Sequence, residues 1–282
     1  MSVKILIDSG SDITIKQAEE MGIVSLPIEV NFSGDTYMDG DNIIAEEFYN
    51  KLAEAKELPK TTQINSYRFE EEFKKYTENG DEVIYLSLSS KISGTYNNAR
   101  LTAEQFDGKV HVVDTMTATS GMRVLAEYAL NLIQEGKTAK EIAEALEAKK
   151  DKVRVFAMID TLKYLKMGGR ISGAAAVIGN MMSIKPVIGV LDGEVKVVGK
   201  SVGAKKAFVL IEQLIKDHGD IDLSLPHCYV FSGTDLKNYN SFLNTASNFY
   251  GDNASEIKGY SLGATIGSHI GPGAVGVAYF AK

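Results

Sequence analysis

The sequence has few of the residues that redox and metal chemistry require. Its 282 residues include one cysteine, Cys228, and four histidines. A single cysteine excludes an internal disulfide, and the apolar run around it predicts a buried strand thiol. The sequence has no C-x-x-C pair, no H-x-x-x-H pair and no G-x-x-x-x-G-K-[ST] loop. We therefore predict no metal site and no cofactor.

An excess of basic charge is also missing. The chain has 30 Lys and Arg against 37 Asp and Glu, a net charge of −7. Nucleic acids and anionic membranes attract basic surfaces, so neither is expected as a partner. The first apolar run meets Asp8 too soon for a signal peptide, and Asn180, Lys185 and Pro186 interrupt the most apolar stretch, 171–191. We predict a cytoplasmic chain without stable membrane insertion.

The hydrophobic pattern divides the chain into two α/β halves. In residues 1–155 short apolar runs alternate with helical spacing, which predicts a mainly parallel α/β/α sandwich. In residues 156–282 an Asp192-Gly193 turn joins two apolar runs, which indicates a hairpin and a smaller α/β domain with a mainly antiparallel sheet. We expect two domains, 1–155 and 156–282, with the ligand site in the crevice between them.

More detailed predictions follow from the same pattern. Residues 23–30 are expected to form one strand, and residues 162–182 an interrupted helix. Residues 171–182, rich in Ala, Gly, Ile and Met, suit the wall of an apolar channel or ordinary helix packing equally well.

Four loops carry the polar residues that could bind a ligand. They are 8–12 (Asp-Ser-Gly-Ser-Asp), 59–63 (Pro-Lys-Thr-Thr-Gln), 87–96, which is rich in serine, and 267–273, which holds His269 among glycines. Parallel sheets bind ligands at such strand ends. Hydroxyls and backbone N–H groups near a helix start suit a carboxylate. Helix capping explains the first two loops as well, so anion or metal binding and capping both stay open there.

Seven segments in this order resemble the DegV family of bacterial fatty-acid-binding proteins. They are 8–12, 60–63, 93–96 (Ser-Gly-Thr-Tyr), 169–173 (Gly-Arg-Ile-Ser-Gly), 184–187 (Ile-Lys-Pro-Val), 192–193 and 269–273 (His-Ile-Gly-Pro-Gly), and they extend over nearly the whole chain. The resemblance implies a carrier that buries the tail of one long-chain fatty acid and holds its carboxylate with hydroxyls. The chain would not be an enzyme.

The resemblance also assigns the head-group residues. The family's Thr-Ser-Gln motif falls on Thr61, with Thr62 in place of the serine, and the serine of its Ser-Gly-Thr-Tyr motif is Ser93. Thr61 and Ser93 are the expected carboxylate ligands, with Thr62, Gly94 and His269 beside them. Family members of the FakB type present the fatty acid to a separate kinase, for use in phospholipid metabolism. Here Val202 stands where the family often has arginine, which argues against a kinase partner.

Two other functions stay open at this point. Ser93 as nucleophile and His269 as base would make an acyl hydrolase or transferase, although Ser93 lies in no G-x-S-x-G elbow. The likeness of the family's fold to dihydroxyacetone kinases suggests a phosphotransferase subunit, although the chain lacks a phosphate-binding Gly-Lys loop.

Overall fold

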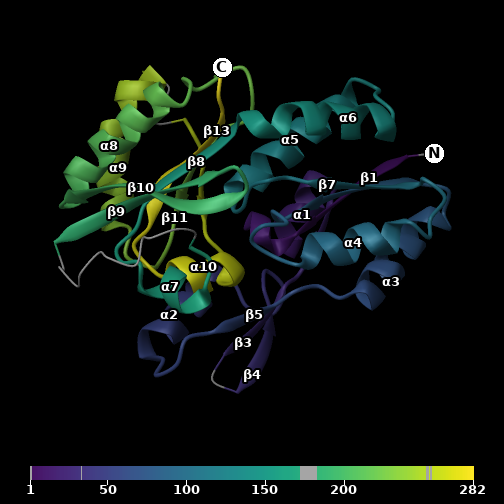
Figure 1. Cartoon of the computed structure of the whole chain (residues 1–282), viewed down its shortest axis with the longest axis horizontal. Coiled ribbons are helices and arrows are strands. Elements are labelled where there is room, and N and C mark those ends of the chain that lie inside the picture. Colours follow the sequence, from purple (N-terminus) through teal and green to yellow (C-terminus); the bar gives the residue numbers. More distant parts are fainter. Residues whose placement is uncertain (1, 33, 172–182, 252–253, 255) are drawn as a thin grey trace.

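Three sheets organise the computed structural model, which describes residues 2–32, 34–171, 183–251, 254 and 256–282. Figure 1 shows two large sheets side by side with helices around them, and a small strand group below. The α/β class expected from the sequence is confirmed.

The first sheet is parallel throughout and has the order β2-β1-β6-β7, with strands β1 (Val3–Asp8), β2 (Val24–Leu26), β6 (Glu82–Ser87) and β7 (Val110–Asp114). Alternate residues of its strands enter two different cores. Leu6 and Tyr85 pack with α3 (Ser66–Thr77) and α4 (Thr95–Ala103), whereas Ile5 and Ile7 pack with α5 (Ser120–Gln134) and α6 (Ala139–Lys149). The predicted sandwich is confirmed.

The second sheet has the order β10-β9-β8-β13-β11-β12. Its strands are β8 (Val153–Met158), β9 (Ile184–Leu191), β10 (Glu194–Val202), β11 (Cys228–Phe231), β12 (Gly259–Ser261) and β13 (Val275–Phe280). All pairs are antiparallel except β11 with β12. Asp192 and Gly193 both have positive φ in the β9–β10 turn, as the predicted hairpin requires. Helices α8 (Ala204–Asp217) and α9 (Lys237–Tyr250) cover one face and α5 the other.

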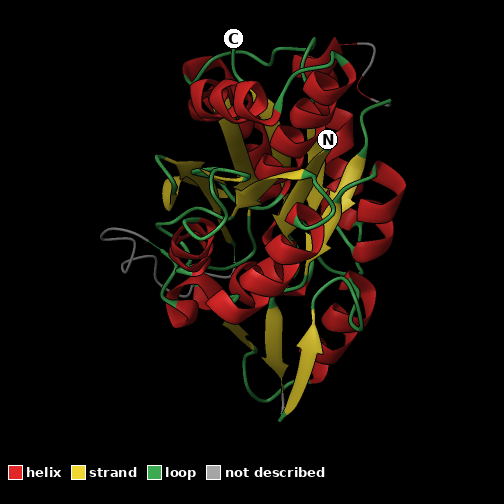
Figure 2. Ribbon diagram, turned by 90° about the vertical axis from the view of Figure 1, so that its right-hand side faces the viewer, coloured by secondary structure: helices red, strands yellow, loops and turns green. Residues whose placement is uncertain are grey.

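The third sheet was not predicted. It has the order β4-β3-β5, with β3 (Glu29–Phe32), β4 (Asp35–Met38) and β5 (Lys60–Thr62), and it projects at the bottom of Figure 2. The single strand expected over residues 23–30 is therefore wrong: β2 ends at Leu26 and β3 begins after Pro27, which has no N–H for a ladder. The loop expected at 59–63 is also wrong, because Lys60–Thr62 pairs with β3.

Two helices, α7 (Lys163–Gly168) and α10 (Ala264–Ile270), differ from what the sequence pattern predicts. Helix α7 spans only Lys163–Gly168 and ends at Gly169 in the left-handed conformation; the rest of the predicted helix and most of the predicted channel wall, 172–182, lie outside the described residues. The loop expected at 267–273 begins as helix α10 (Ala264–Ile270), so His269 stands on a helix end. The remaining helices are α1 (Ile15–Met21), α2 (Ala45–Glu54), η1 (Ser9–Ser11) and η2 (Lys150–Lys152).

The division at residue 155 stays a proposal. Every strand of the second sheet starts at Val153 or later, but α10 packs against α2, β3 and β5 of the first half. Among the described residues, no helix is both long and apolar enough to cross a membrane.

Candidate functional site

A partly polar cavity of about 320 Å³, here called the head-group cavity, lies where β5, the loop after β6 and α10 meet. Its walls combine hydroxyls, one imidazole, one guanidinium and apolar side chains, and the lining residues are Ile28, Thr61, Thr62, Gln63, Leu88, Ile92, Ser93, Gly94, Arg170, Thr265, Ile266 and His269. All five predicted site residues are among them.

Thr61 and His269 are 208 positions apart and form a direct contact. The Oγ1 atom of Thr61 lies 3.0 Å from Nε2 of His269, and both side chains are half-buried. Thr61 is held by the pairing of β5 with β3, where it stands opposite Val30. His269 comes from the last turn of α10. The small third sheet thus brings the threonine to the helix that carries the histidine.

The surroundings of His269 determine its protonation. Burial, and to a smaller extent the positive charge of Arg170, lowers the pKa of His269 to about 4, so the imidazole is neutral at pH 7. Its Nδ1 atom is buried without a hydrogen-bond partner among the described residues and lies against Gly168. An unpaired N–H costs more than an unpaired lone pair on a weak acceptor, so the proton belongs on Nε2. His269 then donates to Thr61 and leaves the threonine O–H free to donate into the cavity.

Ser93 lies at the start of α4, on the other side of the cavity. Its Oγ donates to Oγ1 of Thr95 at 2.9 Å and accepts from the Thr95 amide at 3.2 Å. Gly94 is the N-cap of α4, and no side-chain hydrogen bond caps the helix there. A side chain on Gly94 would collide with Gln63, whose Oε1 would lie 2.0 Å from the added Cβ. The glycine therefore allows a close approach between the strand β5 region and the start of α4.

Thr62 has a different environment from Thr61, because successive strand residues point to opposite faces. The Thr62 hydroxyl lies 3.4 Å from Oε1 of Glu29 and accepts from Nδ2 of Asn31 at 3.3 Å, and the residue is exposed. Thr62 borders the cavity, but its hydroxyl is directed to the outer face of the third sheet.

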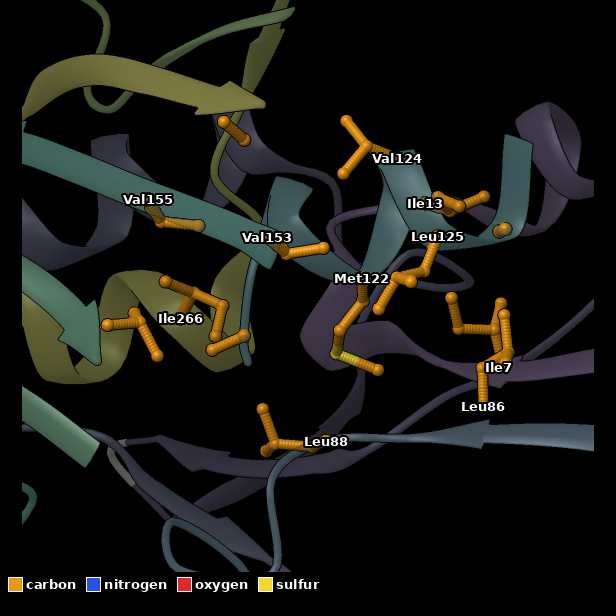
Figure 3. Packing of buried hydrophobic residues seen from close by; sticks show 14 of the residues in the cluster. Ile7, Ile13, Leu86, Leu88, Met122, Val124, Leu125, Val153, Val155 and Ile266 are labelled. Carbon is orange, nitrogen blue, oxygen red and sulfur yellow. The ribbon is translucent and has the colours of Figure 1, made fainter. Parts of the chain in front are cut away.

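An apolar channel continues from the head-group cavity into the protein. It has a volume of about 70 Å³ and shares Ile92, Arg170, Ile266 and His269 with the cavity. Figure 3 shows Ile266 of α10 beside Val155 of β8, two of the side chains that line this channel. Most of the wall consists of aliphatic side chains from both halves of the chain: Ala118, Val155, Ala157, Leu165, Ile188, Val190, Val195, Val230, Leu262, Ile270 and Ala274.

Arg170 is the residue that reasoning on the sequence missed. It lines both the cavity and the channel, and its Nη1 donates to the carbonyl of Gly168 at 2.6 Å. The Gly-Arg-Ile-Ser-Gly segment supports the family resemblance, but a carboxylate held by hydroxyls alone assigns no role to its arginine. In the structure Arg170 is the cation that borders the cavity.

Two glycine patterns in the sequence match functional motifs, and the structure decides the role of both. Residues 271–276 have the spacing G-x-G-x-x-G, but they lead into β13 and open no helix, unlike a dinucleotide fingerprint. Residues 259–263 read G-x-S-x-G and run from β12 to Gly263, the N-cap of α10. Ser261 does not have the positive φ of a nucleophile elbow, and no histidine lines the cleft beside it.

Comparisons with known proteins agree with this architecture. The family model described as "Uncharacterised protein, DegV family" matches residues 2–282. The chain belongs to the DegV family. A protein named fatty acid-binding protein from Thermotoga maritima is 34% identical over 98% of this chain and 96% of its own length.

Solved DegV structures share the whole fold. A Thermus thermophilus structure described as fatty acid binding of a DegV family protein has a TM-score of 0.88 and 30% identity over 100% of both chains. A stearic acid-binding protein from Eubacterium ventriosum ATCC 27560 has a TM-score of 0.85 and 25% identity over 100% of this chain and 99% of its own. The sequence-based family assignment and the fold of both sheets are confirmed.

Proposed function

We propose that this chain binds one long-chain fatty acid, with the carboxylate in the head-group cavity and the tail in the apolar channel. The observation that carries the proposal is that the two spaces adjoin, because four residues line both. An amphiphile with one polar end and one long apolar end matches this pair of environments. DegV relatives described as fatty-acid-binding support the same class of ligand.

The head-group cavity offers hydrogen-bond donors to a carboxylate, and its cation, Arg170, is exposed. Thr61 is set by His269 to donate its O–H, and Ser93 can turn its O–H from Thr95 toward a carboxylate. The first N–H groups of α4 add a favourable dipole. Hydrogen bonds to a charged acceptor contribute about 1.5–3 kcal/mol each. We propose Thr61 and Ser93 as the principal ligands, with Gly94, Thr62 and His269 completing the wall.

The apolar end supplies most of the affinity. Burying one CH₂ group is worth about 0.8 kcal/mol, so a tail of roughly fifteen carbons offers on the order of 10 kcal/mol before ordering costs. These costs include widening the channel, because a volume of about 70 Å³ holds only part of such a tail. We infer a carrier rather than a catalyst. Ser93 bonds to Thr95 and His269 bonds to Thr61, so the described residues do not pair this serine with this histidine as nucleophile and base.

A kinase partner is the finer part of the proposal. Val202, at the end of β10, is 62% exposed, so an arginine at this position would reach solvent and a partner. The valine cannot form a forked ion pair, and we expect any kinase coupling to be weak. The cytoplasmic location also stays a prediction from the sequence.

Native mass spectrometry of gently purified protein, followed by solvent extraction, tests the function. A mass excess that extraction identifies as one fatty acid supports the carrier. A protein that is empty and takes up neither oleate nor palmitate contradicts it. Cleavage of a chromogenic acyl ester that is lost in Ser93→Ala would favour the hydrolase, and calorimetric binding of ATP would favour the phosphotransferase.

A further inference from the structure

Helix α10 carries three cavity residues, Thr265, Ile266 and His269, but its own sequence does not cap its start. The N-cap is Gly263, which has no side chain, and no local side-chain hydrogen bond replaces one. Ser, Thr, Asp and Asn are the usual N-caps because their oxygens accept the free N–H groups of the first turn. In this helix the acceptors come from the other half of the chain.

Two buried carboxylates occupy that position. Asp39 accepts from the amides of Ala264 and Thr265 at 2.8 and 2.9 Å, one with each oxygen, and Asp12 accepts from the amide of Gly263 at 2.8 Å. Asp39 is 2% exposed and Asp12 is 6% exposed. Three consecutive N–H groups of the helix start are therefore satisfied by residues more than 220 positions away.

Two glycines permit this close approach. A Cβ on Gly263 would lie 2.8 Å from Oδ1 of Asp39, and a Cβ on Gly267 would lie 2.6 Å from the side chains of Phe48 and Tyr49. The face of α10 that turns toward the first half thus has no side chains at these two positions. The start of α10 is therefore capped by residues that are remote in the sequence and not by its own N-cap side chain.

The same small sheet holds the other end of the helix. Asp39 directly follows β4, whose partner β3 also pairs with β5, and β5 carries Thr61. Thr61 contacts His269 at the last turn of α10. The third sheet therefore contacts α10 at its start through Asp39 and at its end through Thr61.

We propose that Asp39 is a positioning residue for ligand binding: by capping α10 from the third sheet, it fixes His269 against Thr61 and Ile266 in the channel wall. This inference rests on the proposed fatty-acid binding for its affinity readout alone. Asp12 assists at Gly263. Burial raises the pKa of Asp39 and raises that of Asp12 to about 7, so both carboxylates reduce stability near neutral pH. A cost of this kind is typical of residues retained for a site.

Asp39→Asn tests the proposal in the full-length protein. An amide can accept only one of the two N–H groups and presents an N–H to the other, so the start of α10 loses its cap. We expect at least tenfold weaker binding in displacement of a fluorescent fatty acid. The NMR titration midpoint of His269 should rise from near 4 toward 6.5, because the displaced imidazole becomes hydrated. Asp41→Asn makes the same charge change two residues away on an exposed side chain and should alter neither value.

A second variant covers the case in which Asp39→Asn does not fold. Gly263→Ala keeps both carboxylates and has an ordinary backbone φ of −71°, but its methyl group displaces Asp39. It should weaken binding about fivefold and also raise the His269 midpoint. Wild-type affinity and an unchanged His269 midpoint in a folded Asp39→Asn or Gly263→Ala protein would overturn the positioning role. If the wild-type protein binds no fatty acid, the proposed function fails, and the His269 midpoint still decides the role of Asp39.

Discussion

Two polar loops follow neighbouring parallel strands, and they use their polar groups in different ways. After β1, the Asp8 carboxylate accepts from the Tyr85 hydroxyl at 2.7 Å and from the amides of Leu88 and Gly10 at 2.9 and 3.0 Å, and it is fully buried. After β6, the half-buried Ser93 bonds through its hydroxyl to Thr95 alone among the described residues, and it borders a cavity.

The difference follows from charge. A buried carboxylate is tolerable only when the chain supplies donors to both oxygens, so the first loop is internally complete. A neutral hydroxyl can exchange one partner for another at little cost, so the second loop can receive a ligand. Polar composition alone does not distinguish a structural loop from a binding loop; the number of partners that the fold supplies does.

The largest expected effect is on the first loop. Asp8→Ala leaves the Tyr85 hydroxyl and two amides without an acceptor, so the free energy of unfolding should fall by about 3 kcal/mol or more. Ser93→Ala should change it by less than about 1 kcal/mol. Urea unfolding of both variants measures the contrast. Equal losses in the two proteins would remove the distinction between the loops.

Substitutions in the head-group cavity should change the affinity for a fatty acid more than the stability of the protein. Thr61→Val keeps the shape and removes the donor, so fatty-acid binding should weaken by about 10- to 100-fold, the equivalent of one hydrogen bond to a charged group. Thr62→Val is the matched control, because its hydroxyl faces Glu29 and Asn31, and it should stay within about threefold. A larger effect at Thr62 than at Thr61 would reverse our assignment of the two threonines.

The stability of the protein at low pH should depend on the buried His269. The pKa of His269 is about 4 in the folded protein and near 6.5 when unfolded, so the unfolded chain binds the extra proton first as the pH falls. Stability from this residue is present above pH 6.5 and is lost toward pH 4. Wild-type protein should lose on the order of 2 kcal/mol more than His269→Gln between pH 7 and 4.5. Asp8 and Asp12, whose raised pKa values act in the opposite direction, are common to both proteins and cancel.

The apolar channel should determine which lengths of fatty-acid tail bind. Ala118→Leu fills part of the apolar wall and should weaken binding of the longest tails about tenfold while sparing shorter ones. Ile188→Val removes one methyl group from the same wall and serves as the opposite change. A series of saturated fatty acids of increasing length measures the preference. An unchanged length profile in Ala118→Leu would place the tail elsewhere.

The smallest effect is expected at a residue that lines neither space. Val202→Arg changes an exposed side chain that lines neither the cavity nor the channel, so fatty-acid affinity should not change. If a fatty acid kinase acts on this protein, the same variant should increase acyl phosphate formation. A change in affinity without kinase would connect the end of β10 to the site, although Val195, at the start of this strand, is its residue that lines the channel.

Much of the fold followed from local patterns. The mainly parallel sheet of the first half and the Asp192-Gly193 hairpin were predicted correctly from apolar spacing and turn chemistry. The third sheet was not, because its strands have only three or four residues and Pro27 separates β3 from β2. β5 also pairs with β3 across an intervening strand and helix, so no local periodicity marks that pairing.

The sequence by itself determined the family, the two kinds of sheet and the residues that border the cavity, because these depend on periodicity and on short motifs. Only the tertiary structure decided how those residues are used. It separated Thr61 from Thr62 by strand alternation, placed Arg170 at the cavity and moved His269 from a loop to a helix held by Asp39. Such roles depend on contacts between segments more than 200 positions apart, and pairings at that range leave no local pattern in the sequence.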